Sequence, residues 1–215
     1  MENKALEILN IIKSQNYEAY IVGGYPRDKY LNINSFDIDI CTNMSIKELK
    51  KIFEIQDETN FGTCKIRYQN EIFEISLFRK DNYVDSRYPK IEYVNTLKED
   101  LIRRDFTINM LCIDYKGEYV DYYNSIKDID NRIIRCLTDS KEKIIEDPLR
   151  IVRALRFTSD LDFNIEESLK QNIIEYKYLL KNISKNRINK ELEKIKNKEN
   201  FSKLLIELDL EDSFK

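Results

Sequence analysis

The sequence contains no histidine among its 215 residues. This absence excludes catalytic triads built on histidine, histidine metal ligands and His-Asp phosphohydrolase sites. Any catalysis by this chain must therefore depend on carboxylates, metal ions and cationic side chains.

Cysteine is sparse, and the four cysteines lie far apart within apolar stretches, at Cys41, Cys64, Cys112 and Cys136. This spacing is typical of small core residues in a reduced protein and does not favour a disulfide set or a zinc site. The sequence also has no apolar run near the ~20 residues that span a membrane, and no secretion signal at its start. We therefore expect a cytoplasmic protein without a membrane span.

The formal net charge is only −3, from 36 basic and 39 acidic residues. A nucleic-acid partner would therefore need a local basic surface. A lysine-rich end of the chain, which includes Lys181, Arg187 and Lys198, could contact phosphates or could be a solvated helix face.

Hydrophobic spacing and turn residues predict the order of the elements. Helices are expected at 3–14, 26–31, 46–53 and 101–111, strands at 17–22 and 36–40, hairpins at 63–78 and 112–121, and a long loop at 79–93. Beyond about Thr138 the strand patterns stop, and helices are expected at 140–160, 165–180 and 185–208. The pattern predicts an α/β head over residues 1–138 and a helical segment over residues 139–215.

The first candidate site is a glycine turn between a buried strand and a short helix. Gly23 and Gly24 lack side chains, so backbone N–H groups there can approach a phosphate. Pro26 suits the first turn of the following helix.

Two aspartates follow in the next predicted strand. Because side chains alternate along a strand, Asp37 and Asp39 share one face, about 6–7 Å apart. Two parallel carboxylates beside a phosphate-binding turn indicate a pair of Mg²⁺ ions that handle a nucleoside triphosphate. The alternative is an ordinary turn and a solvated strand edge. Glu74 is either a third carboxylate near the metals or a solvent-facing strand residue.

A second polar cluster begins the predicted helix at residues 101–111. Arg103 and Arg104 could hold phosphate oxygens, since guanidinium pairs with phosphate in bidentate fashion. Asp105, Thr107 and Asn109 could reach a ribose or a triphosphate. The alternative is a helix cap with a surface ion pair.

A third cluster lies at the start of the helical segment. At about 100° per residue, Glu146, Asp147, Arg150 and Arg153 fall on one polar arc, and Ile145 falls on the apolar side. An aspartate acceptor beside an arginine donor complements the amino group and ring nitrogen of cytosine or adenine. The alternative is that Asp147 caps a helix that starts at Pro148 and that Arg150 is its surface partner.

Arg156 lies among the apolar positions of the same helix, so we expect it to have a specific partner.

Taken together, these motifs resemble the class II tRNA nucleotidyltransferase family, which includes CCA-adding enzymes and bacterial poly(A) polymerases. The similarity covers about residues 18–195. The loop at 79–93 resembles the flexible loop of the family, with Asp85 and Arg87 at matching places. Residues 183–192 resemble its later helical motif, although Asn186 stands where an acidic residue is usual.

The resemblance implies a polymerase-β-like head, a mixed sheet with flanking helices, followed by a helical neck and a truncated body. It implies template-independent addition of C and A to tRNA 3′ ends from CTP and ATP. Asp37 and Asp39, with Glu74 as a further candidate, would bind two Mg²⁺ ions. The triphosphate and ribose would contact Gly23, Gly24, Arg27, Asp28, Arg103, Arg104, Asp105, Thr107 and Asn109. Glu146, Asp147, Arg150 and Arg153 would select the base.

Family members usually continue with body and tail domains that grip the tRNA, so the end of the sequence at Lys215 leaves length control open. An A-adding enzyme or a poly(A) polymerase is an alternative within the family. A non-catalytic nucleotide- or RNA-binding module is an alternative of another class.

Overall fold

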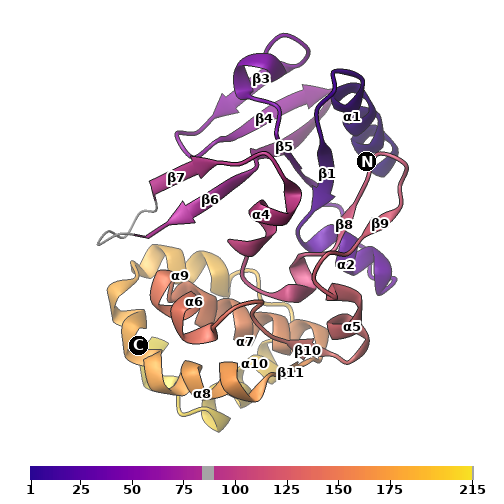
Figure 1. The fold of residues 1–215 in the computed structure, drawn as a ribbon. Helices are drawn as coiled ribbons and strands as arrows, with labels where there is room; N and C mark the ends of the chain where they lie inside the picture. Colours follow the sequence, from indigo (N-terminus) through magenta and orange to yellow (C-terminus); the bar gives the residue numbers. More distant parts are fainter. Residues whose placement is uncertain (84–89, 215) are drawn as a thin grey trace. The chain divides into compact units, whose positions relative to one another are not determined.

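The computed structural model describes residues 1–83 and 90–214, which form two compact units (Figure 1). The first unit comprises Met1–Arg104 and Asn109–Ile126, and the second comprises Asp105–Ile108 and the chain from Lys127 onward. By packing, residues 127–138 belong with the second unit. The functional boundary expected near residue 138 stays a prediction.

The first unit is built on a mixed sheet. Within the described residues the strand order is β3-β4-β5-β2-β1-β8-β9. The strands are β1 (Ala19–Val22), β2 (Asp39–Thr42), β3 (Glu54–Glu58), β4 (Thr63–Tyr68), β5 (Glu71–Leu77), β8 (Cys112–Ile113) and β9 (Tyr119–Val120). The helices are α1 (Glu2–Ser14), α2 (Gly24–Tyr30), α3 (Ile46–Leu49) and α4 (Leu97–Ile102). Strands β2 and β5 are parallel, and the other pairs are antiparallel.

One face of this sheet carries the core. The apolar face of α1 packs with Ile21, Ile40 and Ile75 in a buried cluster. Because neighbouring strand residues point to opposite faces, Asp39 and Glu74 lie on the other face of the sheet. The burial of one face thus assigns the polar residues of β2 and β5 to the other.

Two expectations for the first unit were wrong, and one strand was not predicted. Strand β3 was not expected, because its residues are largely exposed and lack a periodic apolar pattern. Strands β6 (Arg79–Asn82) and β7 (Lys90–Tyr93) pair in antiparallel fashion, whereas a loop was expected throughout 79–93. Asp37 precedes β2, outside any strand, and the neighbouring Phe36 is 76% exposed although alternation predicted it on the buried face.

The helix expected at 101–111 is also wrong. Helix α4 ends at Ile102, and a separate 3₁₀ turn, η1, spans Thr107–Asn109. The N–H of Thr107 donates to the carbonyl oxygen of Arg135 at 3.0 Å. A contact far along the chain therefore replaces the helical hydrogen bond that local propensity favours.

The second unit is helical apart from one short parallel strand pair within the described residues. Its helices are α5 (Ser125–Asp130), α6 (Ser140–Glu146), α7 (Leu149–Leu161), α8 (Glu167–Tyr176), η2 (Lys177–Asn182), α9 (Lys185–Leu192), α10 (Lys198–Glu207) and η3 (Glu211–Phe214). Strand β10 (Ile133–Ile134) pairs with β11 (Asn164–Ile165), which the sequence did not predict. Phe106 packs edge-on against Phe157 of α7 at 6.0 Å between ring centroids.

The helix expected at 140–160 is two helices. Asp147 is extended, with φ −147° and ψ 99°, because a residue before proline disfavours the helical region. Helix α6 therefore ends at Glu146, and α7 starts after Pro148. The change of direction leaves Ile145 53% exposed, so its expected place on the apolar side was wrong.

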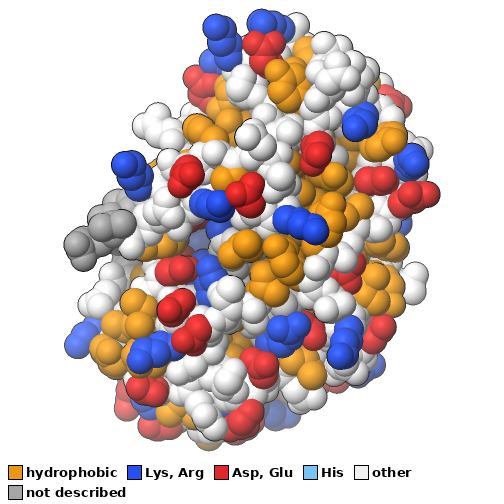
Figure 2. Space-filling view, viewed as in Figure 1, with side chains coloured by type: hydrophobic (Ala, Val, Ile, Leu, Met, Phe, Trp, Pro, Cys, Tyr) orange, Lys and Arg blue, Asp and Glu red, His pale blue; other side chains and the backbone are white. Residues whose placement is uncertain are grey.

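Acidic and basic side chains are interspersed on the face shown in Figure 2, as the small net charge suggests. Within the described ranges, no helix has the length and apolar character needed to cross a membrane.

Candidate functional site

The glycine turn of the first unit lies directly against a carboxylate. Gly23 caps the N-terminus of α2 with φ +83°, and a Cβ at this position would lie 3.2 Å from Oδ2 of Asp39. Val22 pairs with Asp39 across strands β1 and β2, which explains the proximity. The positive φ therefore favours glycine here, and a side chain would crowd the Asp39 carboxylate.

Two of the predicted acidic residues lie on neighbouring strands of the sheet, and the third precedes β2. Asp39 is half-buried, and Glu74 is its register partner on β5. Adjacent strands lie about 4.8 Å apart, so the two backbones place these carboxylates side by side. Asp37 is exposed just before β2, and the buried Ile38 separates it from Asp39.

Such carboxylates are the ligands that hard divalent cations prefer. The exposed Asp37 and the half-buried Asp39 beside a glycine turn fit a metal-bound triphosphate. Among the residues that the structure describes, no group of three or more acidic or cysteine side chains is close enough to hold a metal ion. Glu74 as a third ligand therefore stays a prediction.

Arg27, Asp28 and Asn109 form one buried network. Arg27 donates to Oδ1 of Asp28 from Nε at 2.9 Å and from Nη2 at 2.6 Å. Its Nη1 donates to Oδ1 of Asn109 at 2.5 Å, although Asn109 is 82 residues away. The fold thus unites three residues that the sequence placed in two separate motifs.

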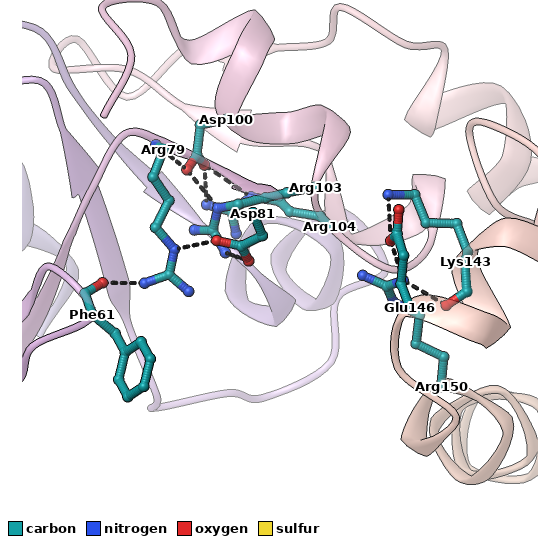
Figure 3. Close-up of polar contacts among 9 residues, drawn as sticks. All are labelled: Phe61, Arg79, Asp81, Asp100, Arg103, Arg104, Lys143, Glu146 and Arg150. Carbon is teal, nitrogen blue, oxygen red and sulfur yellow. Dashed lines mark hydrogen bonds and ion pairs between the residues drawn. The ribbon is translucent and has the colours of Figure 1, made fainter. Parts of the chain in front are cut away.

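Arg103 and Arg104 converge on Asp100, which is fully buried (Figure 3). Nε of Arg103 lies 2.9 Å from Oδ1 of Asp100, and Nη2 of Arg104 lies 2.8 Å from Oδ2. Burial alone would raise the pKa of Asp100, but the two guanidinium groups outweigh it and hold this pKa below its ordinary value. Sequence reasoning missed Asp100, although its i+3 and i+4 spacing to two arginines was a usable signal.

A second carboxylate joins this cluster from strand β6. Asp81 accepts from Nε of Arg79 at 2.9 Å, and its Oδ2 lies 3.8 Å from Nη1 of Arg103. Arg79 also donates to the carbonyl oxygen of Phe61 (Figure 3). Three arginines thus meet two carboxylates, and the excess positive charge suits a phosphate group.

The remaining residues of that motif belong to the second unit. Asp105 accepts from Arg153 at 2.7 Å from Nε and 2.5 Å from Nη2, and this contact raises the pKa of the Arg153 guanidinium. Thr107 donates to Oδ2 of Asp128 at 2.5 Å. Asp105 and Thr107 are both buried.

The predicted base-selecting pair has two different sets of partners. Nη1 of Arg150 lies 2.7 Å from Oε2 of Glu146 and 2.6 Å from the carbonyl oxygen of Lys143 (Figure 3). Asp147 caps α7 through the N–H of Leu149 at 3.2 Å, as the alternative interpretation expected. Its ion pair is with Arg187 of α9, at 3.0 Å between Nη2 and Oδ2.

Arg156 has the specific partner that its apolar surroundings predicted. Its Nε donates to Oε1 of the buried Glu191 at 2.6 Å. Asp85 and Arg87 lie outside the described residues.

Comparison with known protein families identifies the family to which this chain belongs. Residues 19–135 match the family described as the poly A polymerase head domain. The chain belongs to this family. Residues 162–211 further match a region described as a probable RNA and SrmB-binding site of polymerase A. The resemblance derived from the motifs, and the expected mixed-sheet head with helical segments, are therefore confirmed.

Relatives of this head domain include curated CCA-adding enzymes. The enzyme of Lactobacillus helveticus is 42% identical over 196 residues, which cover 89% of this chain and 49% of the relative. That of Enterococcus faecalis is 40% identical over the same length, with 48% of the relative covered. The chain thus spans about half the length of the curated relatives it matches.

Solved structures show the same similarity. The Bacillus stearothermophilus CCA-adding enzyme in complex with CTP matches with a TM-score of 0.91 and 32% identity, over 98% of this chain and 53% of that one. A tRNA nucleotidyltransferase complexed with a primer tRNA and an incoming ATP analog matches with a TM-score of 0.79 and 28% identity, over 95% and 61%. Nucleotidyltransferases of this family generally use divalent metal ions.

Proposed function

We propose that this chain carries the catalytic and base-selecting parts of a template-independent tRNA nucleotidyltransferase, which adds C and A to tRNA 3′ ends from CTP and ATP. The observation that carries the proposal is the Asp39 carboxylate held against the glycine turn at Gly23. This arrangement brings a metal ligand and a phosphate-binding backbone to one place. The similarity to CCA-adding enzymes supports this choice of reaction.

Asp37 and Asp39 would hold two Mg²⁺ ions, with Glu74 as a further candidate ligand. When bound, such ions lower the barrier of phosphoryl transfer by neutralising charge on the triphosphate and by favouring the deprotonated 3′-hydroxyl. Strand pairing fixes the backbone positions of Asp39 and Glu74, whereas Asp37 lies just before β2.

The remaining residues of the head bind and orient the nucleotide. The N–H groups at Gly23 and Gly24 face the triphosphate, and Arg27 and Asp28 hold the shape of this turn with Asn109. Arg103 and Arg104 supply positive charge for phosphate oxygens, and Asp100 keeps their guanidinium groups oriented. Asp105 and Asn109 contact the ribose, and the fully buried Thr107 supports this segment through its hydrogen bond to Asp128.

Glu146, Asp147, Arg150 and Arg153 select the base. Cytosine and adenine each present an amino donor beside a ring-nitrogen acceptor, whereas uracil and guanine present a carbonyl beside an N–H. Asp147 accepts from the amino group and Arg150 donates to the ring nitrogen. A mismatched base leaves one group unpaired at a cost of roughly 1–3 kcal/mol.

The partners in this proposal are the tRNA 3′ end, CTP and ATP, and the setting is the cytoplasm. Asp85 and Arg87 contribute to the change from C addition to A addition. The poly A polymerase name of the matching family favours a second candidate, an A-adding enzyme or poly(A) polymerase that uses the same residues.

The test uses purified protein, Mg²⁺ and a tRNA that ends just before its terminal CCA. Each nucleoside triphosphate is supplied alone, and then CTP and ATP are supplied together. Growth by three nucleotides that needs both CTP and ATP would support the proposal. Growth with ATP alone on a tRNA ending in CC would indicate an A-adder, and an unlimited ATP ladder would indicate a poly(A) polymerase.

Asp37→Ala and Asp39→Ala are expected to abolish growth, while Asp57→Ala, an exposed acid on β3, is expected to retain it. Incorporation that survives the loss of either aspartate would refute the metal assignment. No growth in the wild type, with nucleotide still bound, would mean either that further domains are required or that the chain is a non-catalytic binding module, and the same assay on a longer chain would then decide.

A further inference from the structure

Helix α9 holds two of the base-selecting side chains through residues one helical turn apart. Arg187 and Glu191 are separated by four positions, so they lie on the same face of α9. Arg187 binds Asp147, and Glu191 binds Arg153 of α7. One face of a single helix therefore contacts both the acidic and the basic part of the selecting motif.

The contact of Arg187 with Asp147 fixes the direction of the carboxylate. A single nitrogen, Nη2, lies 3.2 Å from Oδ1 and 3.0 Å from Oδ2, while Oδ1 also accepts from the N–H of Leu149. A carboxylate offers about four acceptor positions. Within the described residues, the two contacts with Arg187 and the one with Leu149 use three of them. The geometry thus leaves an acceptor position on Asp147 for the amino group of a base.

Glu191 contacts Arg153, the basic residue of the selecting motif that faces α9. Glu191 is 3% exposed, and its Oε1 lies 2.6 Å from Nε of Arg156 and 3.6 Å from Nη1 of Arg153. A buried carboxylate of this kind persists only with cationic partners. Glu191 therefore anchors α9 to α7 and keeps the register of Arg187 relative to Asp147.

We propose that Arg187 is a positioning residue for base selection, which holds the Asp147 carboxylate in the orientation that accepts an amino group. This inference rests on the proposed function of Asp147. Without Arg187, the Asp147 side chain rotates and accepts hydrogen bonds from water or other donors. The site then discriminates less between a base with an amino group, cytosine or adenine, and a base with a carbonyl oxygen. Arg187 itself need not touch the nucleotide.

The test compares Arg187→Ala and Arg187→Lys with the wild type, by incorporation of single nucleotides and by calorimetric binding of CTP, ATP, UTP and GTP without RNA. In Arg187→Ala we expect the preference for CTP over UTP to fall about tenfold or more, mainly through a higher KM for CTP with a smaller change in kcat. Arg187→Lys should restore most of the preference, because one donor nitrogen makes both contacts. Lys203→Ala is the matched control, since it removes the basic partner of a surface carboxylate, Glu199, in the same unit.

An equal loss of activity with all four nucleotides, at an unchanged preference, would show that Arg187 only stabilises the fold and would overturn the proposal. Arg187→Gln replaces Arg187→Ala if the alanine variant does not fold. Wild-type protein that binds CTP in preference to UTP but transfers no nucleotide would refute the proposed reaction. The effect of Arg187→Ala on binding would still decide the inference.

Discussion

The carboxylate of Asp39 lies against the Cα of Gly23, so that a methyl group on this glycine would meet Oδ2 at 3.2 Å. The contact joins the first two motifs of the sequence into one site. It also means that the glycine has two separable roles, because it allows φ +83° and it leaves room for the carboxylate.

These two roles can be separated with a second glycine that also has a positive φ. Gly117 also has φ +83°, but a Cβ there would meet only Cδ1 of Leu6, at an ordinary 3.7 Å. We expect both Gly23→Ala and Gly117→Ala to lose stability, roughly 1–3 kcal/mol each, because an L side chain rarely adopts a positive φ. Only Gly23→Ala should lose nucleotide incorporation, by about a hundredfold, since small displacements of reacting groups cost that much. Comparable activity in the two variants would contradict the role of the Asp39 contact.

Asp100 is expected to be a main determinant of stability in the head. Asp100→Asn leaves Arg103 and Arg104 without their buried partner, and breaking such a pair typically costs roughly 3–5 kcal/mol. Because the folded pKa of Asp100 is lowered, its contribution is present above its unfolded pKa, and it is lost as the pH falls through the folded pKa. In urea unfolding, the free energy of unfolding of Asp100→Asn should lie below that of the wild type by the full amount at pH 7. This gap should become smaller below about pH 4.

Glu99→Gln is the control for this experiment, because Glu99 is in the same helix but pairs with Lys80 at the surface. This variant should unfold close to the wild type. If the gap in free energy of unfolding between Asp100→Asn and the wild type did not change with pH, the claim that ionised Asp100 stabilises the fold would be contradicted.

Arg150 gives a direct test of base selection in the second unit. Arg150→Ala removes the donor that Glu146 holds at 2.7 Å, so discrimination against UTP and GTP should fall about ten- to hundredfold. The measurement is kcat/KM for each nucleotide. Arg132→Ala, which removes an exposed arginine near Asp162, should leave the ratios unchanged. If Arg150→Ala discriminated against UTP and GTP as strongly as the wild type, Arg150 would not be a base-selecting residue.

The four cysteines should react slowly in the native protein. All are free and buried, and burial raises the pKa of the Cys112 and Cys136 thiols to about 12. Little thiolate is therefore present at pH 8, and access is blocked. Titration with a chromogenic disulfide should detect few thiols in buffer and four in urea. Rapid reaction of native protein would contradict the core role that their spacing predicted.

Local patterns predicted much of the fold. The helix α1, the hairpin of β4 and β5 and the turn at Gly23 each follow from residues within one short window, because side-chain periodicity and backbone preference act over a few residues. The same rules missed the break before Pro148 and the end of α4 at Ile102. At both places the sequence pattern allowed a continuous helix. Pro148 makes Asp147 extended, and the N–H of Thr107 donates to Arg135, outside any continuous helix over 101–111.

By itself the sequence determined which chemistry is available to this protein: carboxylates and arginines without histidine, in an order that identified the family. Only the tertiary structure decided which polar side chains contact one another. Arg27 meets Asn109 from 82 residues away, and Asp147 meets Arg187 from 40 residues away. A motif fixes the type of side chain and its face on an element, whereas an ion pair between elements depends on packing that no short window contains.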